Sequence, residues 1–333
     1  EAILRESLAR AGAAWEGAIE LHASPEQGWR TRATLHLGPL PDGETGLGLH
    51  EEGSHRLLDL SVCEQLTPLL HRTQRALLDA LRGHPHRARV RHLQLAQGIE
   101  GEGAVAVLEG DLDPQTASSF ASLDRSIPWL TGFGAVTSRG SFVLLHGSPY
   151  VHSTVLDRRL RVHARAFFQG NRFLVEDLAR TVAALVPAGG VAVDLYAGVG
   201  LFSLALAPQA EAVVALEGNP YAAADALANA RSAGLDRVTV KRGDVLDGLR
   251  HLPVRPEERI VLDPPRSGVG PRVVEAIVGR HPASVVYVSC DPPTLGRDLA
   301  LFQRAGLRPD AVHLFDLFPD TFHLETVVRL TPS

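Results

Sequence analysis

The stretch VAVDLYAGVG, residues Val191–Gly200, decides the fold of this chain. Val191–Leu195 is mostly apolar, as in a strand that is buried on both faces of a parallel sheet. The glycines that follow allow a tight turn and let the backbone approach a ligand closely before a helix begins. The stretch therefore predicts one strand–turn–helix unit of a ligand-binding α/β sheet.

The same rhythm continues through the C-terminal half. Short runs rich in Val or Leu predict buried strands at Val191–Leu195, Ala212–Leu216, Val238–Lys241, Arg259–Leu262 and Ser284–Val288. Stretches that open with proline, which suits the first position of a helix, predict helices at Pro220–Ser232, Pro271–Arg280 and Pro292–Arg304. A further strand is expected at His323–Leu330, after a loop. This order predicts an α/β fold, a doubly wound Rossmann-like domain.

The N-terminal half has a mixed pattern. Strands are predicted at Thr31–Leu37, Arg56–Leu60, Val90–Ala96 and Ala104–Leu108. A helix is predicted at Leu66–Leu81, and Pro149–Leu156 is expected to lead into a strand that ends near Gln169. A chain of 333 residues is longer than one core usually supports. We therefore predict a smaller α+β domain over residues 1–155 and the Rossmann-like domain over residues 156–333.

The glycine-rich turn indicates the class of ligand. The spacing D-x-x-x-G-x-G from Asp194 suits S-adenosylmethionine, whereas a dinucleotide fingerprint needs a third glycine where Ser203 stands. Acidic residues at the ends of the next two strands suit ribose hydroxyls and an adenine. The candidate cofactor contacts are Gly198, Gly200, Glu217 and Asp244. A glycine-rich turn that binds no ligand is the alternative.

Two further segments end neighbouring strands of the predicted sheet. Asp263-Pro264-Pro265-Arg266 follows one of them, at the edge where open α/β sheets bind ligands. A similar motif with an aromatic residue in place of Arg266 occurs in enzymes that methylate exocyclic amines, so Arg266 counts against that chemistry. A rigid Pro-Pro turn is the alternative.

Cys290 ends the next strand, directly before a helix that opens with proline. A helix N-terminus favours the thiolate, which is the nucleophilic form, so we predict a reactive cysteine rather than a small core residue. Glu325 lies in the apolar run Leu324–Val328. Desolvation there would suit it to taking a proton, whereas a surface position on an edge strand is the alternative.

Charge and cysteine content bear on the binding partners and the cellular location of the protein. The net charge of −5 does not indicate a nucleic-acid binder, but arginines cluster locally at positions 72, 75, 82, 87, 89 and 91, and at 158, 159, 161 and 165. Such clusters can neutralise phosphates, although solvated surface is the alternative. Cys63 and Cys290 form no CxxC pair, which excludes a zinc or disulfide framework. Without a signal peptide or a long apolar run, we expect a cytoplasmic enzyme.

The motifs together resemble a known family, the S-adenosylmethionine-dependent RNA 5-methyluridine methyltransferases that modify uridines in bacterial tRNA and 23S ribosomal RNA. The matching motifs, in the family's order, are Phe167–Asn171, Asp194–Gly200, Asp263–Gly268, and Ser289–Pro292 followed by Glu325. The resemblance covers most of the chain and is strongest from Phe167 to Leu330. It implies an N-terminal domain that recognises RNA, a catalytic C-terminal domain, and no obligate protein partner.

The resemblance also implies roles for individual residues. Cys290 would add to the uracil ring as the nucleophile, and Glu325 would remove the proton from carbon 5. Phe167 would stack on the flipped base, and Arg266 would contact the substrate. The residues that would line the cofactor and uracil pocket are Gln169, Tyr196, Glu217 and Asp263.

The chain departs from the family at three points. Leu201 stands where the family usually has Asn, which affects one cofactor contact. Many members hold a [4Fe-4S] cluster with four cysteines, of which only the last is matched, by Cys63. The others would fall upstream of Glu1, as would the β-barrel domain that some members carry, so we expect no iron–sulfur cluster from this chain and no metal site.

Other activities fit part of this pattern. An RNA cytosine-5 methyltransferase uses the same cysteine chemistry, but its cysteine usually lies on the Asp-Pro-Pro strand, which has none here. A small-molecule methyltransferase would share the cofactor fold, because fold alone does not fix function. An RNA-binding or RNA-folding module with residual motifs is a third alternative.

Overall fold

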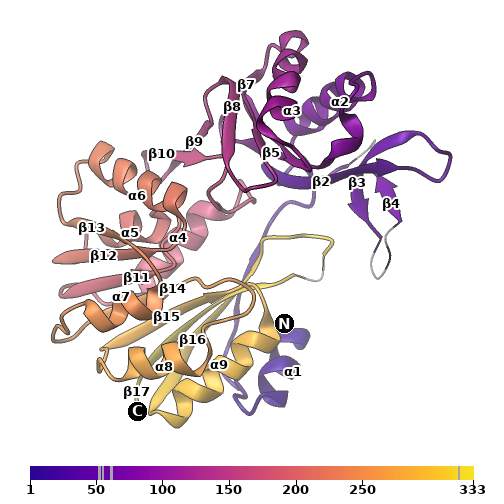
Figure 1. The fold of residues 1–333 in the computed structure, drawn as a ribbon. Coiled ribbons are helices and arrows are strands. Elements are labelled where there is room, and N and C mark those ends of the chain that lie inside the picture. The colour runs from indigo at the N-terminus through magenta and orange to yellow at the C-terminus, as the bar shows by residue number, and fades with distance from the viewer. Residues whose placement is uncertain (52–53, 55, 61–62, 322) are drawn as a thin grey trace.

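The structure, a computed structural model, describes residues 1–333 apart from 52–53, 55, 61–62 and 322, and describes only the backbone of residues 124–126. In this described part, the strands form a large C-terminal sheet, an N-terminal sheet and a two-stranded ribbon. Figure 1 shows the two sheets in separate bodies of the molecule. None of the helices in this part is long and apolar enough to cross a membrane.

Parallel strands form one side of the C-terminal sheet. They are β11 (Val191–Leu195), β12 (Ala212–Glu217), β13 (Val238–Arg242), β14 (Arg259–Leu262) and β15 (Ser284–Ser289). Their order in the sheet is β15-β14-β11-β12-β13, so the chain reverses its direction of travel across the sheet at β11 and β14. The predicted buried strands and the doubly wound fold are confirmed. A ligand site is expected beyond the carboxyl ends of β11 and β14.

The other side of this sheet was only partly predicted. It contains β17 (Glu325–Pro332), β16 (Leu307–Asp316) and β1 (Glu20–Ala23). Strand β17 runs antiparallel to β15 and begins two residues after the predicted start. Strand β16 was not predicted, and an irregularity between Pro309 and Ala311 breaks its alternation.

The N-terminal segment packs with the C-terminal body. Strand β1 pairs in parallel with β16, and helix α1 (Ala2–Arg10) packs on helix α9 (Pro292–Arg304). The side of α1 that carries Leu4 and Leu8 is buried there. Residues 1–23 therefore lie with the C-terminal sheet, whereas the predicted division at residue 155 places them in the N-terminal domain. That division stays a prediction.

Helices cover both faces of the C-terminal sheet, as Figure 1 shows. One face carries α4 (Val175–Leu185), α5 (Leu201–Leu206) and α6 (Pro220–Ser232), and the other carries α7 (Val245–His251), α8 (Gly270–Val278), α9 and α1. Side chains of β15 alternate between them: Val286 and Val288 pack with the first group, and Val285 and Tyr287 with the second. The predicted bounds of α6 and α9 are confirmed, whereas α8 ends two residues early.

The N-terminal sheet runs β4 (Leu57–Asp59), β3 (Thr45–His50), β2 (Arg32–Pro39), β5 (Val90–Gln97), β6 (Ala104–Gly110), β7 (Leu130–Val136) and β8 (Phe142–Gly147). Helix α2 (Pro68–Arg82) buries Leu70, Leu77 and Leu81 against one face. Three short helical turns complete this body: η1 (Arg87–Arg89), α3 (Pro114–Ser119) and η2 (Phe120–Ser126). The predicted strands and helix are confirmed within a few residues at their ends.

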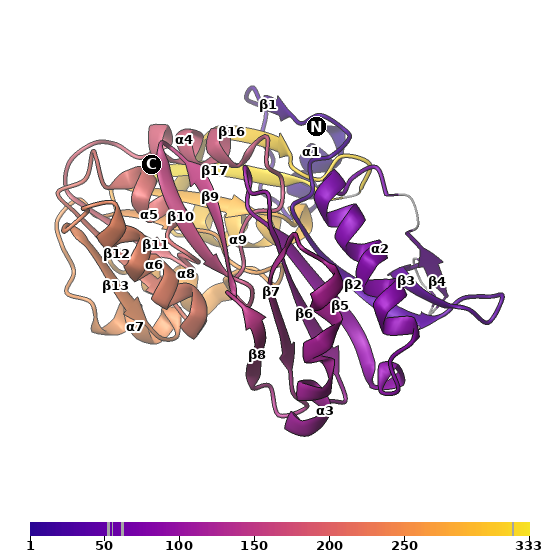
Figure 2. The ribbon, with the colours of Figure 1, turned by 90° about the horizontal axis from the view of Figure 1, so that it is seen from above.

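A hairpin connects the two bodies. Strands β9 (Tyr150–Val155) and β10 (Arg158–His163) replace the single predicted strand, because Leu156 and Asp157 both adopt positive φ and form a tight turn. Strand β9 contacts β5 and β6, while β10 contacts α6, as can be followed in Figure 2. The chain then crosses from β10 to α4 through residues 164–174, between the two sheets.

Candidate active site

A cavity of about 660 Å³ opens at the carboxyl ends of the parallel strands. Its walls come from the turns after β11, β12, β14 and β15, from the start of β17 and from the crossing segment before α4. The structure brings together nearly all the predicted site residues in its lining: Phe167, Gln169, Tyr196, Gly198, Glu217, Asp244, Asp263, Arg266, Cys290 and Glu325. Leu201 lines the same cavity. The sheet edge where a doubly wound fold binds ligands is therefore the edge that carries these groups.

The glycine-rich turn has an unusual backbone. Tyr196, Gly198 and Gly200 all have positive φ, of 60°, 55° and 91°, and only Tyr196 carries a side chain. Such a conformation is costly for a non-glycine residue and is found mostly at functional sites. Gly200 does not line the cavity; a Cβ there would lie 3.3 Å from the Cβ of Ala226. Gly200 allows α5 to pack closely on α6, and its role as a cofactor contact stays a prediction.

Glu217 is fixed at the cavity wall by backbone amides. Its Oε2 accepts a hydrogen bond from the Gly198 N–H at 2.7 Å, and its Oε1 accepts one from the Asn219 N–H at 2.6 Å. Each carboxylate oxygen can accept a second hydrogen bond. The carboxylate is thus oriented in advance for a ligand with hydroxyl groups, such as a ribose.

Gln169 and Asp244 lie at the same cavity. The Gln169 Oε1 atom is buried and has no hydrogen-bond partner among the described residues. A buried acceptor of this kind costs about 1–3 kcal/mol, which a ligand donor would recover. Asp244 caps α7 by accepting a hydrogen bond from the Asp247 N–H at 3.1 Å, and keeps acceptor capacity toward the cavity. These groups fit a nucleoside-containing cofactor.

Cys290, Glu325 and Asp263 form one corner of the cavity. Strands β15 and β17 pair so that Ser289 lies opposite Thr326, which sets Cys290 and Glu325 side by side at the strand ends. Glu325 is 2% exposed, and its Oε1 atom has no partner in the described part of the chain. Burial, and then the charge of Asp263, raise the pKa of Glu325 well above its usual value. The Glu325 carboxyl is desolvated, as predicted.

The surroundings of the Cys290 thiol act against the thiolate form. Burial, followed by the charges of Glu325 and Asp263, raises its pKa to about 11, although Arg266 acts in the opposite direction. The start of α9 does not offset this, since its capping carboxylate, Asp291, accepts a hydrogen bond from the Thr294 N–H at 2.9 Å. In the substrate-free protein these surroundings favour the protonated thiol, so the thiolate stays a prediction for the substrate-bound enzyme. The thiol is only half-buried and borders the cavity, so it is no core residue.

The sequence reasoning missed several residues of this cavity. They are Phe168, Val199, Phe202, Asn219, Phe318 and His323. Asn219 caps α6 by accepting hydrogen bonds from the Tyr221 and Ala222 N–H groups, and Asn before Pro220 was a recognisable helix start. His323 and Arg266 are hydrogen-bonded at 2.9 Å although 57 positions separate them in the sequence. No local sequence pattern indicates such a contact.

The predicted arginine clusters lie elsewhere. Arginines of the first cluster lie on or near α2 and η1: Arg72 stacks on Trp129 at 4.1 Å, and Arg89 pairs with Asp113. In the second cluster, Arg161 pairs with Asp225 at 2.8 Å and Arg165 pairs with Glu109. Several of these charges thus have partners within the protein.

Groups that could hold a metal ion lie away from the cavity. Among the described residues, one group of three has its potential ligand atoms within 4.8 Å of one another: Glu20, His22 and His313, at the β1 side of the C-terminal sheet. Cys63 is half-buried against the hydrophobic core of the N-terminal body.

The fold and the cavity define a class of protein. A Rossmann-like sheet with a glycine-rich turn after β11 and acidic residues after β12 and β13 is an α/β methyltransferase domain, here combined with an N-terminal β-rich body. The crystal structure of a tRNA (uracil-54, C5)-methyltransferase from Pyrococcus abyssi, in complex with S-adenosyl-L-homocysteine, has this fold. It superposes with a TM-score of 0.77 over 99% of this chain and 82% of its own, at 23% identity.

Sequence comparisons identify the family. The tRNA (Uracil-5-)-methyltransferase profile matches residues 251–332, and the TRM5/TYW2 methyltransferase domain profile matches residues 160–291. An uncharacterized RNA methyltransferase of Gloeobacter violaceus is 34% identical over 99% of this chain and 76% of its own length. The 23S rRNA (uracil(1939)-C(5))-methyltransferase RlmD of Halomonas elongata is 32% identical over 98% and 70%. The chain belongs to the S-adenosylmethionine-dependent RNA uracil-5 methyltransferases.

Proposed function

We propose that this enzyme methylates carbon 5 of one uridine in 23S ribosomal RNA through a covalent bond to Cys290. The observation that carries the chemistry is the corner of the cavity where the Cys290 thiol meets the buried Glu325 carboxyl and the half-buried Asp263 carboxyl. The RNA is proposed from two relatives that are 32% identical over more than 90% of this chain, the 23S rRNA (uracil(1939)-C(5))-methyltransferases of Halomonas elongata and Chromohalobacter salexigens, and not from the tRNA-modifying Pyrococcus abyssi enzyme, which is 23% identical.

The polar groups of the cavity divide between two ligands. Gln169, Glu217 and Asp244 lie toward the glycine-rich turn and would hold the nucleoside part of S-adenosylmethionine. When bound, this cofactor supplies an electrophilic methyl group. Cys290 and Glu325 lie toward β15 and β17 and would face the uracil ring.

The chain's own residues then carry the covalent steps. Carbon 5 of uracil is a poor nucleophile. When Cys290 loses its proton to solvent and the thiolate adds to carbon 6, carbon 5 becomes an enolate carbon, which splits a hard step into easier ones. Attack by this carbon on the methyl group leaves S-adenosylhomocysteine. Once carbon 5 holds the methyl group, the Glu325 carboxylate removes its remaining proton. The electron pair left behind re-forms the 5,6 double bond and expels the Cys290 thiolate. Asp263 would hydrogen-bond the pyrimidine edge.

The base must leave its stack to reach this cavity. Extrusion of a nucleotide costs a few kcal/mol, and stacking on an aromatic side chain returns about 1–3 kcal/mol per base. Phe167 suits this role because its ring borders the cavity and is 66% exposed, which is unusual for a large apolar side chain.

Transfer of labelled methyl groups tests the proposal. The purified enzyme is incubated with methyl-labelled cofactor and either unmodified 23S rRNA or unmodified tRNA, and the product nucleosides are separated. We expect label in 5-methyluridine from 23S rRNA, at a single position. Label in tRNA alone would overturn the proposed target, and label in another nucleoside would overturn the proposed chemistry.

A further inference from the structure

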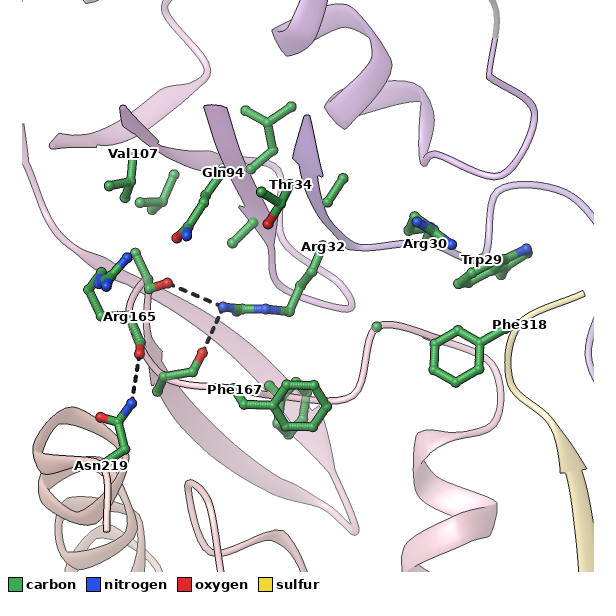
Figure 3. Close-up of a pocket in the computed structure, with 18 of the residues that line it drawn as sticks. Trp29, Arg30, Arg32, Thr34, Gln94, Val107, Arg165, Phe167, Asn219 and Phe318 are labelled. Carbon is green, nitrogen blue, oxygen red and sulfur yellow. Dashed lines mark hydrogen bonds between the residues drawn. The ribbon is translucent and has the colours of Figure 1, made fainter. Parts of the chain in front are cut away.

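A second cavity of about 560 Å³ lies between the N-terminal sheet and the crossing segment before α4. Figure 3 shows its labelled residues, with Arg32, Thr34 and Gln94 on the N-terminal sheet facing Phe167. We name it the flanking cavity. It shares a wall with the active-site cavity, because both are lined by Phe167, Phe168, Asn219, Arg266, Phe318 and His323.

The wall of the flanking cavity that belongs to the N-terminal sheet carries both polar and apolar side chains. Thr34 of β2 and Gln94 of β5 are direct cross-strand partners, and both side chains border the cavity. The apolar side chains of Val105 and Val107 lie beside them on β6. An amide and a hydroxyl next to an apolar surface suit the edge and the face of a nucleobase.

Arg32 supplies a positive charge that forms no ion pair with the residues that the structure describes. Its Nη2 donates to the main-chain carbonyls of Ala166 at 2.8 Å and Ala164 at 3.4 Å, whereas its Nη1 is buried and has no partner in the described part of the chain. Desolvation lowers the pKa of this guanidinium to about 10, and no carboxylate among the described residues opposes the shift. A guanidinium with a free N–H beside a cavity is suited to an anion such as a phosphate.

Arg30 adds a second such group near the cavity. Its guanidinium lies 4.6 Å from the Trp29 ring, its Nε is buried without a partner, and desolvation lowers its pKa. Arg30 and Arg32 lie on either side of Thr31 in the sequence. The N–H and the hydroxyl of Thr31 donate hydrogen bonds to the Gly170 carbonyl at 2.8 and 3.0 Å. The basic wall is therefore held firmly against the segment that carries Phe167.

We propose that the flanking cavity holds the nucleotide next to the methylated uridine in the same RNA strand, with its base against Thr34 and Gln94 and a phosphate at Arg32. The proposal rests on the proposed function, because it requires an RNA whose target base enters the neighbouring cavity. The shared wall gives the reason for adjacency: two consecutive nucleotides can occupy two cavities separated by Phe167. Recognition of the flanking base then contributes to the choice of target.

An abasic scan with a matched variant tests this. RNA oligonucleotides with one abasic site, at each position around the target in turn, are methylated by the wild-type enzyme and by the Gln94→Ala variant. At one position adjacent to the target, base removal should lower kcat/KM by about 5- to 100-fold for the wild type, which corresponds to about 1–3 kcal/mol. Gln94→Ala should lose much of this penalty, because the two changes remove the same interaction.

The control is Gln115→Ala, a Gln→Ala change at an exposed position of α3 in the same body. It should keep the full penalty at the adjacent position. If Gln94→Ala and Gln115→Ala show the same penalties as the wild type at every position, the flanking cavity holds no base and the proposal is overturned. In that outcome the wild type still methylates its target, so the proposed function stands; a wild type that transfers no methyl group would overturn both.

Arg32 is tested through salt dependence. Loss of one phosphate contact should make the slope of log Kd for the RNA against log salt smaller by about 0.7, the value expected for a single strand. We expect this for Arg32→Gln, with unchanged affinity for S-adenosylhomocysteine as the check that the neighbouring cavity is intact. An unchanged slope with intact cofactor binding would contradict the phosphate contact.

Discussion

Glu258 and Asp263 stand at the two ends of one strand, β14, and their surroundings are opposite. Glu258 precedes the strand and is 1% exposed, and its two oxygens accept hydrogen bonds from Arg280 at 2.7 and 2.8 Å. Asp263 follows the strand and faces Glu325 and Cys290, and its pKa is raised by burial and by neighbouring carboxylates. The charge of Glu258 is compensated by Arg280, whereas the charge of Asp263 is not compensated in this way.

The end of β14 at Glu258 serves the stability of the fold, and the end at Asp263 serves the active site. Arg280 also donates to the carbonyls of Leu249, Leu252 and Pro253, so the pair at this end of β14 has little capacity left for a ligand. At the carboxyl end, unpartnered polar atoms and raised pKa values destabilise the empty site, which a substrate would relieve. We therefore expect substitutions at the two ends to act on different properties.

The largest effect should come from the carboxyl end. Cys290→Ala should lower methyl transfer by at least about 10³-fold, because Cys290 is the one thiol among the described residues that line the cavity. Affinity for S-adenosylhomocysteine, measured by calorimetry, should stay within about twofold. Cys63→Ala is the matched control and should keep full activity; retained turnover in Cys290→Ala would contradict the nucleophile.

The opposite end should respond in stability. Arg280→Ala leaves Glu258 buried without its partner, which should lower the free energy of unfolding by about 3–5 kcal/mol in denaturant titrations. Arg250→Ala removes an exposed arginine 3.9 Å from Asp247 and should cost less than about 0.5 kcal/mol. Equal effects for the two variants would remove the contrast between the ends of β14.

The pH profile should reflect the raised pKa of the Cys290 thiol, at about 11. Attack needs the thiolate and the final step needs the Glu325 carboxylate, so both groups must lose protons and kcat/KM should rise with pH. We expect a further rise of about tenfold between about pH 8.5 and 9.5, where an ordinary thiol is already largely ionised. A plateau reached below about pH 7.5 would show that the thiol is activated before substrate binds.

The smallest effect should be a gain in stability. The pKa of Glu325 is raised in the folded protein, so its carboxylate destabilises the fold once the pH exceeds the unfolded value of about 4.3. Glu325→Gln removes this penalty and should raise Tm by about 2–4 °C at pH 8. The gain should disappear toward pH 4, where the wild-type carboxyl is protonated in both states; a lower Tm at pH 8 would argue against the buried, unpaired carboxylate.

Much of the carboxyl end could be predicted from sequence. The strands β11 to β15 are short apolar runs, and in a parallel sheet all of their ends meet at one edge, so residues that follow them must lie together. That argument placed Glu217, Asp244, Asp263 and Cys290 at one edge without any tertiary information, and all four line the cavity. It does not decide the role of Gly200, because a glycine in a turn can serve packing as well as ligand approach.

Other features depend on contacts that local patterns do not encode. Strand β1 pairs with β16, almost 300 positions away, and β3, β7 and β8 were missed. Strands β3 and β7 contain glycines that weaken a strand pattern. At Gly48 a Cβ would lie 1.8 Å from the Leu58 carbonyl, so close strand approach requires glycine there. The raised pKa of Cys290 could not be predicted from sequence, because it depends on burial and on Glu325 and Asp263, which come together only in the fold.

One measurement tests the central claim most directly. Glu325→Gln enzyme is mixed with its RNA and cofactor, the proteins are denatured and separated by size, and any RNA-bound protein is digested for mass spectrometry. We predict a denaturant-stable adduct in which a methylated uridine is attached to the Cys290 peptide, because the proton on carbon 5 can no longer be removed. No adduct from a variant that binds RNA and cofactor normally, or an adduct at another residue, would contradict the account.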